Sequence, residues 1–114
     1  MPDQELTYST APGAVEGTVI LKLHGPFILG NIFDLQKDIR AMKPSCLIMD
    51  LSGVPYMDSA GLGVLMNYYV SAESNHRKFF LVGLDERVRA LLEMTKVHNI
   101  LKICDSVEAA EAKA

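Results

Sequence analysis

Two short runs in this chain are apolar almost throughout, and they constrain the fold more than any other feature of the sequence. They cover residues 46–51 and 78–83, with the sequences CLIMDL and KFFLVG. A strand with one face in water alternates apolar and polar residues, whereas a strand covered on both faces does not. We therefore expect both runs to be central strands of a largely parallel sheet that helices cover.

Segments with helical periodicity lie between and after these runs. Apolar residues recur at intervals of three and four from Ile32 to Met42, which predicts a helix with Asn31 as its N-cap. A second predicted helix begins at residues 58–59 and ends near residues 74–76. The apolar residues that we expect on its inward face are Leu62, Leu65, Met66 and Tyr69.

Two more helices are predicted from capping residues. Asp85 is the expected N-cap of a helix with Val88, Leu91 and Leu92 turned inward. Asp105 is followed three residues later by Glu108, which is typical of a capping box at the start of a final helix.

The remaining strand candidates are residues 6–9, 18–24 and 100–104, and the first two are expected to form a hairpin. The predicted order is β-β-α-β-α-β-α-β-α. Alternation of this kind implies right-handed crossovers between parallel strands, with the hairpin as an antiparallel edge. We therefore expect residues 1–114 to form a single α/β domain with a four- to five-stranded mixed sheet and about four helices.

Charge and hydropathy argue against several classes of partner. The net charge is -3, so the chain has no basic excess with which to bind nucleic acid. No apolar run approaches the ~20 residues that cross a bilayer, so no membrane span is expected. The first five residues, MPDQE, are polar and acidic, unlike a secretory signal, and we expect the protein in the cytoplasm.

The cysteines and histidines give little support for a metal or cofactor site. Cys46 and Cys104 lie far apart in apolar runs, which favours two small buried side chains over a disulfide or a metal pair. His24, His76 and His98 are isolated from one another. We predict no metal and no cofactor, because zinc sites need closely spaced pairs of such ligands.

The run Asp58-Ser59-Ala60-Gly61-Leu62-Gly63 is the segment most suggestive of function. It follows a buried strand and opens a helix, where functional sites gather in α/β sheets. Asp58 is a natural N-cap, which places Ser59 at the first helical position, within reach of solvent. Gly61 and Gly63 each cost a helix about 1 kcal/mol relative to alanine. That cost indicates close approach by another molecule or tight backbone packing.

The residues around Ser59 allow four interpretations of its role. A nucleophile would need a base, yet the helix start carries neither histidine nor lysine, and the G-x-S-x-G elbow is absent. Phosphate binding by the glycines would need a P-loop or a complete dinucleotide motif. Ser59 could instead receive a phosphate, whose charge a helix start tolerates. On spacing alone, the simplest interpretation is that Asp58 and Ser59 only cap the helix.

A family resemblance favours the phosphate acceptor. Residues 49–54, MDLSGV, followed by residues 56–65, YMDSAGLGVL, closely resemble the core of STAS domains and especially bacterial anti-sigma factor antagonists. The similarity extends from about Thr18 to Ala110 and includes the order of elements. The D-S-x-G-L-G signature in this context is far more specific than an isolated pair of glycines.

The resemblance implies a partner-switching protein, not an enzyme. Such a protein, when unphosphorylated, binds an anti-sigma factor that is also a serine kinase, and so frees a sigma factor. The kinase phosphorylates the serine after the signature aspartate, here Ser59, and a phosphatase resets the switch. By the same resemblance, Asp58 supports the helix start, and Gly61, Leu62 and Gly63 belong to the docking face. We expect a monomer or a weak homodimer.

The chain departs from the family pattern in residues 25–30, GPFILG, where Ile28 stands in place of a frequent aspartate. This loop is expected near the Ser59 helix. Its apolar residues could be core or an exposed docking patch, and Phe27 and Ile28 are therefore candidate partner contacts. The patch favours an alternative function, in which the chain is a STAS interaction module of a transport or signalling assembly that is not phosphorylated.

Overall fold

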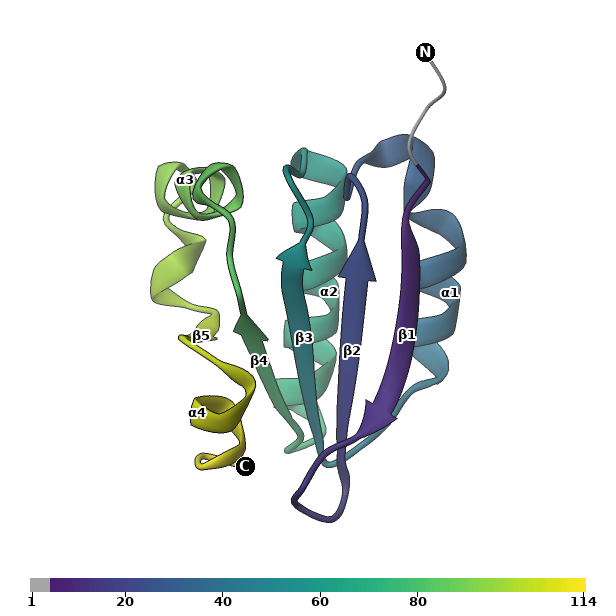
Figure 1. The fold of residues 1–114 in the computed structure, drawn as a ribbon, viewed down its shortest axis with the longest axis vertical. Coiled ribbons are helices and arrows are strands. Elements are labelled where there is room, and N and C mark those ends of the chain that lie inside the picture. The colour runs from purple at the N-terminus through teal and green to yellow at the C-terminus, as the bar shows by residue number, and fades with distance from the viewer. Residues whose placement is uncertain (1–4) are drawn as a thin grey trace.

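In the computed structural model of the protein, which describes residues 5–114, one mixed sheet has the strand order β1-β2-β3-β4-β5 (Figure 1). β1 (Thr7–Pro12) and β2 (Thr18–His24) form the predicted antiparallel hairpin. The other neighbouring pairs are parallel, and their strands are β3 (Cys46–Gly53), β4 (Lys78–Val82) and β5 (Lys102–Cys104). The predicted α/β class and mixed sheet are confirmed. Residues 1–4, whose polarity argued against a secretory signal, lie outside the described residues.

The helices alternate with the parallel strands in the predicted order. They are α1 (Phe33–Ala41), α2 (Ser59–Ser74), α3 (Glu86–Met94) and α4 (Val107–Glu111). Single 3-10 turns, η1 (Leu29–Asn31) and η2 (Val97–Asn99), precede α1 and follow α3. Among the described residues, no helix is both long and apolar enough to cross a membrane.

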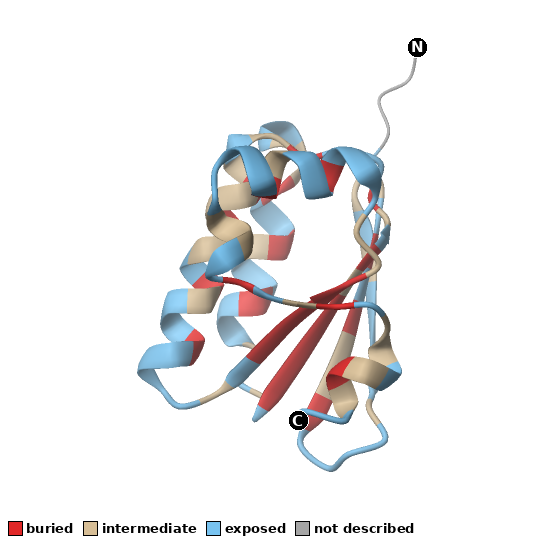
Figure 2. Ribbon diagram, turned by 90° about the vertical axis from the view of Figure 1, so that its left-hand side faces the viewer, coloured by how far each residue is buried: buried red, intermediate tan, exposed pale blue. Residues whose placement is uncertain are grey.

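The sheet is covered differently on its two faces. Alternate residues of β2, β3 and β4, such as Leu21, Met49 and Leu81, join α1, α2 and α3 in the larger core. On the other face, Cys46, Ile48, Phe80, Val82 and Cys104 form a smaller core with Ala110 of α4. Figure 2 shows the buried residues concentrated on the central strands and on the helix faces turned toward them. The apolar runs of β3 and β4 are thus buried on both faces, as predicted.

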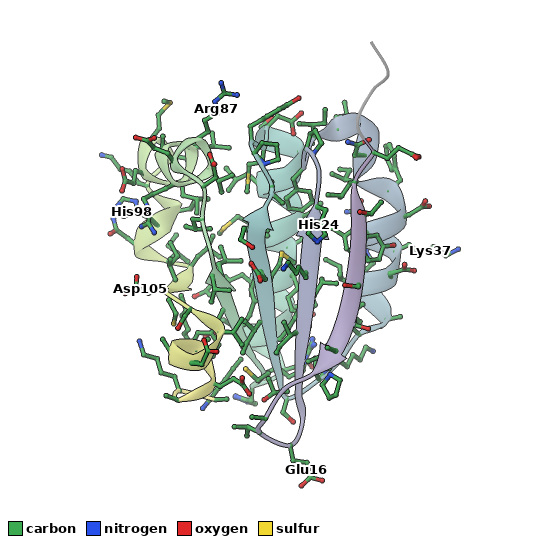
Figure 3. The ribbon with its side chains drawn as sticks, in the orientation of Figure 1. Glu16, His24, Lys37, Arg87, His98 and Asp105 are labelled. Carbon is green, nitrogen blue, oxygen red and sulfur yellow. The ribbon has the colours of Figure 1, made fainter. Side chains whose placement is uncertain are left out.

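Two predicted caps are wrong by one residue. The N-cap of α1 is Ile32, because Asn31 ends η1 and its side-chain Nδ2 donates to the carbonyl of Pro26 at 3.0 Å. The N-cap of α4 is Ser106, whose Oγ accepts from the Ala109 amide at 3.1 Å. Asp105 precedes this cap and is exposed (Figure 3). Asn31 is thus used by the turn that precedes α1, whereas Asp105 lies one residue before the serine that caps α4.

The inward face of α2 also differs from the prediction. Leu65 is buried as predicted, and the other buried residues are Gly61, Val64, Tyr68 and Ala72. Leu62, Met66 and Tyr69 are only half-buried, although they pack against the larger core. The helix is apolar on most of its circumference, so the periodicity of its large side chains did not identify the face that packs on the sheet.

Candidate functional site

The candidate site lies at the edge of the sheet to which the carboxyl ends of the parallel strands point. The loop after β2 and the loop after β3 meet there, and α1 and α2 start from them (Figure 1). Phe27 and Met57 join the two loops as an isolated parallel bridge. The Phe27 amide donates to the carbonyl of Tyr56 at 3.1 Å, and the Asp58 amide donates to that of Phe27 at 3.3 Å. The expected proximity of the 25–30 loop to the Ser59 helix is confirmed.

Asp58 joins these two loops through its side-chain carboxylate, and we call this contact the Asp58 junction. Its Oδ1 accepts from the amides of Ala60 and Gly61 at 2.9 and 3.1 Å, which makes it the N-cap of α2, as predicted. Its Oδ2 accepts from the Leu29 amide at 3.1 Å, in the loop after β2. One carboxylate therefore fixes both the start of α2 and the approach to α1, a second role that the sequence pattern did not indicate.

Ser59 is the first residue of α2 and is exposed. Among the described residues, none is hydrogen-bonded to its hydroxyl. The neighbouring amides of Ala60 and Gly61 are already occupied by Asp58. A phosphate on Ser59 would therefore face solvent and lie beside a carboxylate, instead of being enclosed by the helix start. Such a group would change the surface at the start of α2 and not the fold itself.

The two glycines of the first turns have different surroundings. A Cβ on Gly61 would lie 2.3 Å from the carbonyl oxygen of Phe27, so this glycine permits close backbone packing within the chain. A Cβ on Gly63 would meet nothing within 4 Å. Tight packing therefore explains Gly61 and does not explain Gly63. Gly61 is itself buried, which corrects our prediction that it lies on a docking face.

The apolar loop between β2 and α1 is divided between core and surface. Phe27 is fully buried, Ile28 is half-buried, and the Leu29 side chain is 58% exposed. Phe27 is therefore part of the core, which corrects our prediction that it contacts a partner. Its ring fills the space beneath the junction, because a Cβ on Gly61 would lie only 3.1 Å from its Cγ.

An exposed aromatic residue beside this loop was not predicted from the sequence. Phe33 is the first residue of α1 and is 65% exposed. Together with Leu29, it gives the segment that follows the Asp58 junction two exposed apolar side chains. A signal was available: Phe33 falls outside the stripe that runs through Leu35 and Ile39, where a solvated helix face would carry a polar residue.

Residues 5–114 place no recorded hydrogen-bonding partner at the Ser59 hydroxyl. A serine nucleophile needs a base within hydrogen-bonding distance, and none of the described residues meets this condition at Ser59. His24 belongs to β2 and His98 to η2, and the two histidines lie well apart from each other (Figure 3). Residues 5–114 contain no group of three or more histidines, cysteines or carboxylates that could hold a metal ion.

The cysteines are buried and free, as the apolar pattern predicted. Burial raises the pKa of the Cys46 thiol, which keeps it protonated. Both residues lie in the smaller core beneath α4, away from the junction at Asp58.

Comparison with known proteins identifies a family that this chain matches. The model of the STAS domain family matches residues 11–110. An anti-sigma-B factor antagonist of Listeria monocytogenes is 39% identical over 57 residues, which are 50% of this chain and 50% of that protein. The chain thus spans about half the length of the curated relatives that it matches first.

Solved structures share the fold. An anti-sigma factor antagonist from Mycobacterium paratuberculosis superposes with a TM-score of 0.83 at 21% identity, over 99% of this chain and 96% of that one. A sulfate transporter family protein from Wolinella succinogenes gives 0.75 at 24% identity, over 87% and 85%. At these identities the likeness establishes the arrangement of the elements and leaves the role of the chain to be argued from the site.

Proposed function

This chain belongs to the STAS domain family, and on that premise we propose that it is an anti-sigma factor antagonist that acts by partner switching. Residues 1–114 act as one binding module and not as an enzyme. The unphosphorylated module binds an anti-sigma factor that is also a serine kinase, and thereby frees a sigma factor. The circuit operates where transcription takes place, so the proposal puts the chain in the cytoplasm.

The observation that carries this proposal is the exposed hydroxyl of Ser59 beside a fully engaged N-cap. The kinase transfers the γ-phosphoryl group of ATP to Ser59 Oγ, and the hydroxyl proton passes to a base of the kinase. The Asp58 carboxylate already accepts from Ala60 and Gly61, so the new phosphate remains on the surface. It weakens binding by its bulk and charge where the partner docks, until a phosphatase removes it.

The proposed docking face joins the starts of both helices. From α2 it takes Ser59, Leu62 and Gly63, and the open space at Gly63 lets a partner approach the backbone. From the loop after β2 and the first turn of α1 it takes Ile28, Leu29 and Phe33. Exposed apolar side chains with polar residues around them are typical of protein interfaces, and Asp58 joins the two halves of this face through the Leu29 amide.

A phosphorylation assay tests the proposal. We expect an anti-sigma serine kinase encoded near this chain to transfer phosphate to Ser59, and mass spectrometry to map the modification there. Ser59→Ala abolishes it. Ser74→Ala is the matched control, because Ser74 is an exposed serine at the other end of the same helix, and it leaves the modification intact. Modification that persists in Ser59→Ala, or is absent in every growth phase of the native cell, would refute the switch.

The alternative is a STAS interaction module without phosphorylation, which the exposed Leu29 and Phe33 favour. In that case, binding to the native partner depends on these side chains and not on Ser59. Both Ser59→Ala and Ser59→Asp would then leave the affinity unchanged, whereas Phe33→Ala would weaken it. Under partner switching, Ser59→Asp weakens binding and Ser59→Ala preserves it.

A further inference from the structure

A cavity of about 210 Å3 lies between α1 and α2. Its apolar lining includes Ile39 of α1 and Val64 and Tyr68 of α2, all buried in the larger core. The volume is below the roughly 300 Å3 at which pockets for drug-sized ligands begin. The cavity therefore accommodates only a small ligand, and its lining favours one with an apolar body.

Each polar side chain that lines this cavity carries at least one hydrogen-bond donor, and none of them is a carboxylate. Gln36 and Arg40 come from α1, Asn67 and Ser71 come from α2, and Arg77 comes from the turn after α2. Two guanidinium groups at one small cavity are notable in a chain whose net charge is -3. A site with this composition favours a negatively charged group.

Arg77 is held in place by neutral partners. Its terminal nitrogens donate to the Tyr68 hydroxyl at 3.3 Å, to the Ser71 hydroxyl at 3.0 Å and to the Met42 carbonyl at 3.4 Å. Its guanidinium carbon also lies 5.6 Å from the centre of the Tyr68 ring. A guanidinium group has five N–H donors, so the three bonds leave donors unused. The group is oriented, half-buried and not neutralised by any described carboxylate.

Two carboxylates of the same helices are engaged elsewhere. On α1, Asp38 accepts from the Tyr8 hydroxyl of β1, and this bond, together with burial and the charges of Asp38 and Asp34, raises the pKa of Tyr8 to about 12. On α2, Glu73 pairs with Lys102 at 3.6 Å. Arg40 forms no ion pair with any residue that the structure describes. The two arginines of the cavity therefore share an unmatched positive charge.

We propose that this cavity binds a small organic anion whose charged group meets Arg40 and Arg77 and whose short apolar body rests on Ile39, Val64 and Tyr68. A carboxylate is the simplest such group, because guanidinium groups bind it through paired hydrogen bonds. The bound anion contacts both helices that begin at the Asp58 junction. The proposal does not depend on partner switching, since the site is separate from Ser59.

Titration followed by NMR tests this proposal on the whole chain. The probes are hexanoate, 1-hexanol, which has the same apolar body without the charge, and acetate, which has the charge without the body. We expect hexanoate, at constant ionic strength, to shift the methyl signals of Ile39 and Val64 saturably. Hexanol and acetate are expected to bind about ten-fold or more weakly than hexanoate, because hexanol lacks the charged group and acetate lacks the apolar body.

Two variants identify the charge that matters. Arg40→Gln removes an exposed guanidinium of the cavity and is expected to weaken hexanoate binding about ten-fold. Arg89→Gln removes an equally exposed arginine of α3, away from the cavity, and should leave binding unchanged. The proposal is overturned if hexanoate causes no saturable shift, if hexanol binds as tightly as hexanoate, or if the two variants weaken binding equally.

Discussion

Replacing Gly61 by alanine is expected to lower the free energy of unfolding by about 2–3 kcal/mol. The new Cβ would lie 2.3 Å from the Phe27 carbonyl oxygen, far inside van der Waals contact. That oxygen cannot move freely, because it also accepts from the Asp58 amide. Either α2 or the loop after β2 must shift, and the junction at Asp58 is strained. Urea denaturation followed by circular dichroism measures the change.

Gly63→Ala is the matched control for this prediction. It adds the same methyl group to the same helix, two residues later, where a Cβ meets nothing within 4 Å. We expect it to raise the free energy of unfolding by about 0.5–1 kcal/mol, the ordinary gain of alanine over glycine in a helix. If Gly61→Ala were tolerated as well as Gly63→Ala, the close backbone contact would be wrong. On the proposed docking face, the stabilising Gly63→Ala should also weaken partner binding.

Asp58→Ala is expected to destabilise the protein by about 2 kcal/mol, more than the loss of an ordinary helix cap. The carboxylate accepts from three amides, and two of them belong to the start of α2. The third is that of Leu29, so the variant also frees the approach to α1. Hydrogen exchange should show the Leu29 amide losing its protection together with those of Ala60 and Gly61.

Asp85→Ala provides the comparison for Asp58→Ala. Asp85 is the N-cap of α3 and accepts a single bond, from the Arg87 amide at 2.9 Å. Losing this carboxylate should lower the free energy of unfolding by about 1 kcal/mol and should leave the hydrogen exchange of the Leu29 amide unchanged. Equal effects of the two substitutions would show that Asp58 is only a helix cap and does not join the two loops.

Local patterns in the sequence predicted most of the fold. The apolar runs of β3 and β4 indicated strands buried on both faces, because no helix of ordinary length fits so few residues. The hairpin and the caps of α2 and α3 followed from turn and capping chemistry. The cap at Asn31 was wrong because its side chain bonds to the Pro26 carbonyl in the adjacent turn. The cap at Asp105 was wrong because the next residue, Ser106, caps α4 instead.

The arrangement around the site was less predictable, since it depends on contacts between distant segments. Asp58 was identified as a cap, but its bond to Leu29 spans 29 residues and has no signature in the sequence. The same holds for the two glycines: both suggested close approach, and only the fold separates Gly61, packed on Phe27, from Gly63, which is open. Likewise, the sequence alone did not show that Leu29 is exposed while the nearby Phe27 is buried, because this difference depends on the conformation of the loop.

The affinity of the proposed anti-sigma kinase for this chain, with and without a phosphate on Ser59, tests the central claim most directly. Calorimetry on unphosphorylated and fully phosphorylated protein should show binding weakened by about ten-fold or more. The amide spectrum should change only around residues 58–63, since Asp58 keeps its bonds to Ala60 and Gly61. Equal affinities, with a folded and fully modified protein, would contradict the account.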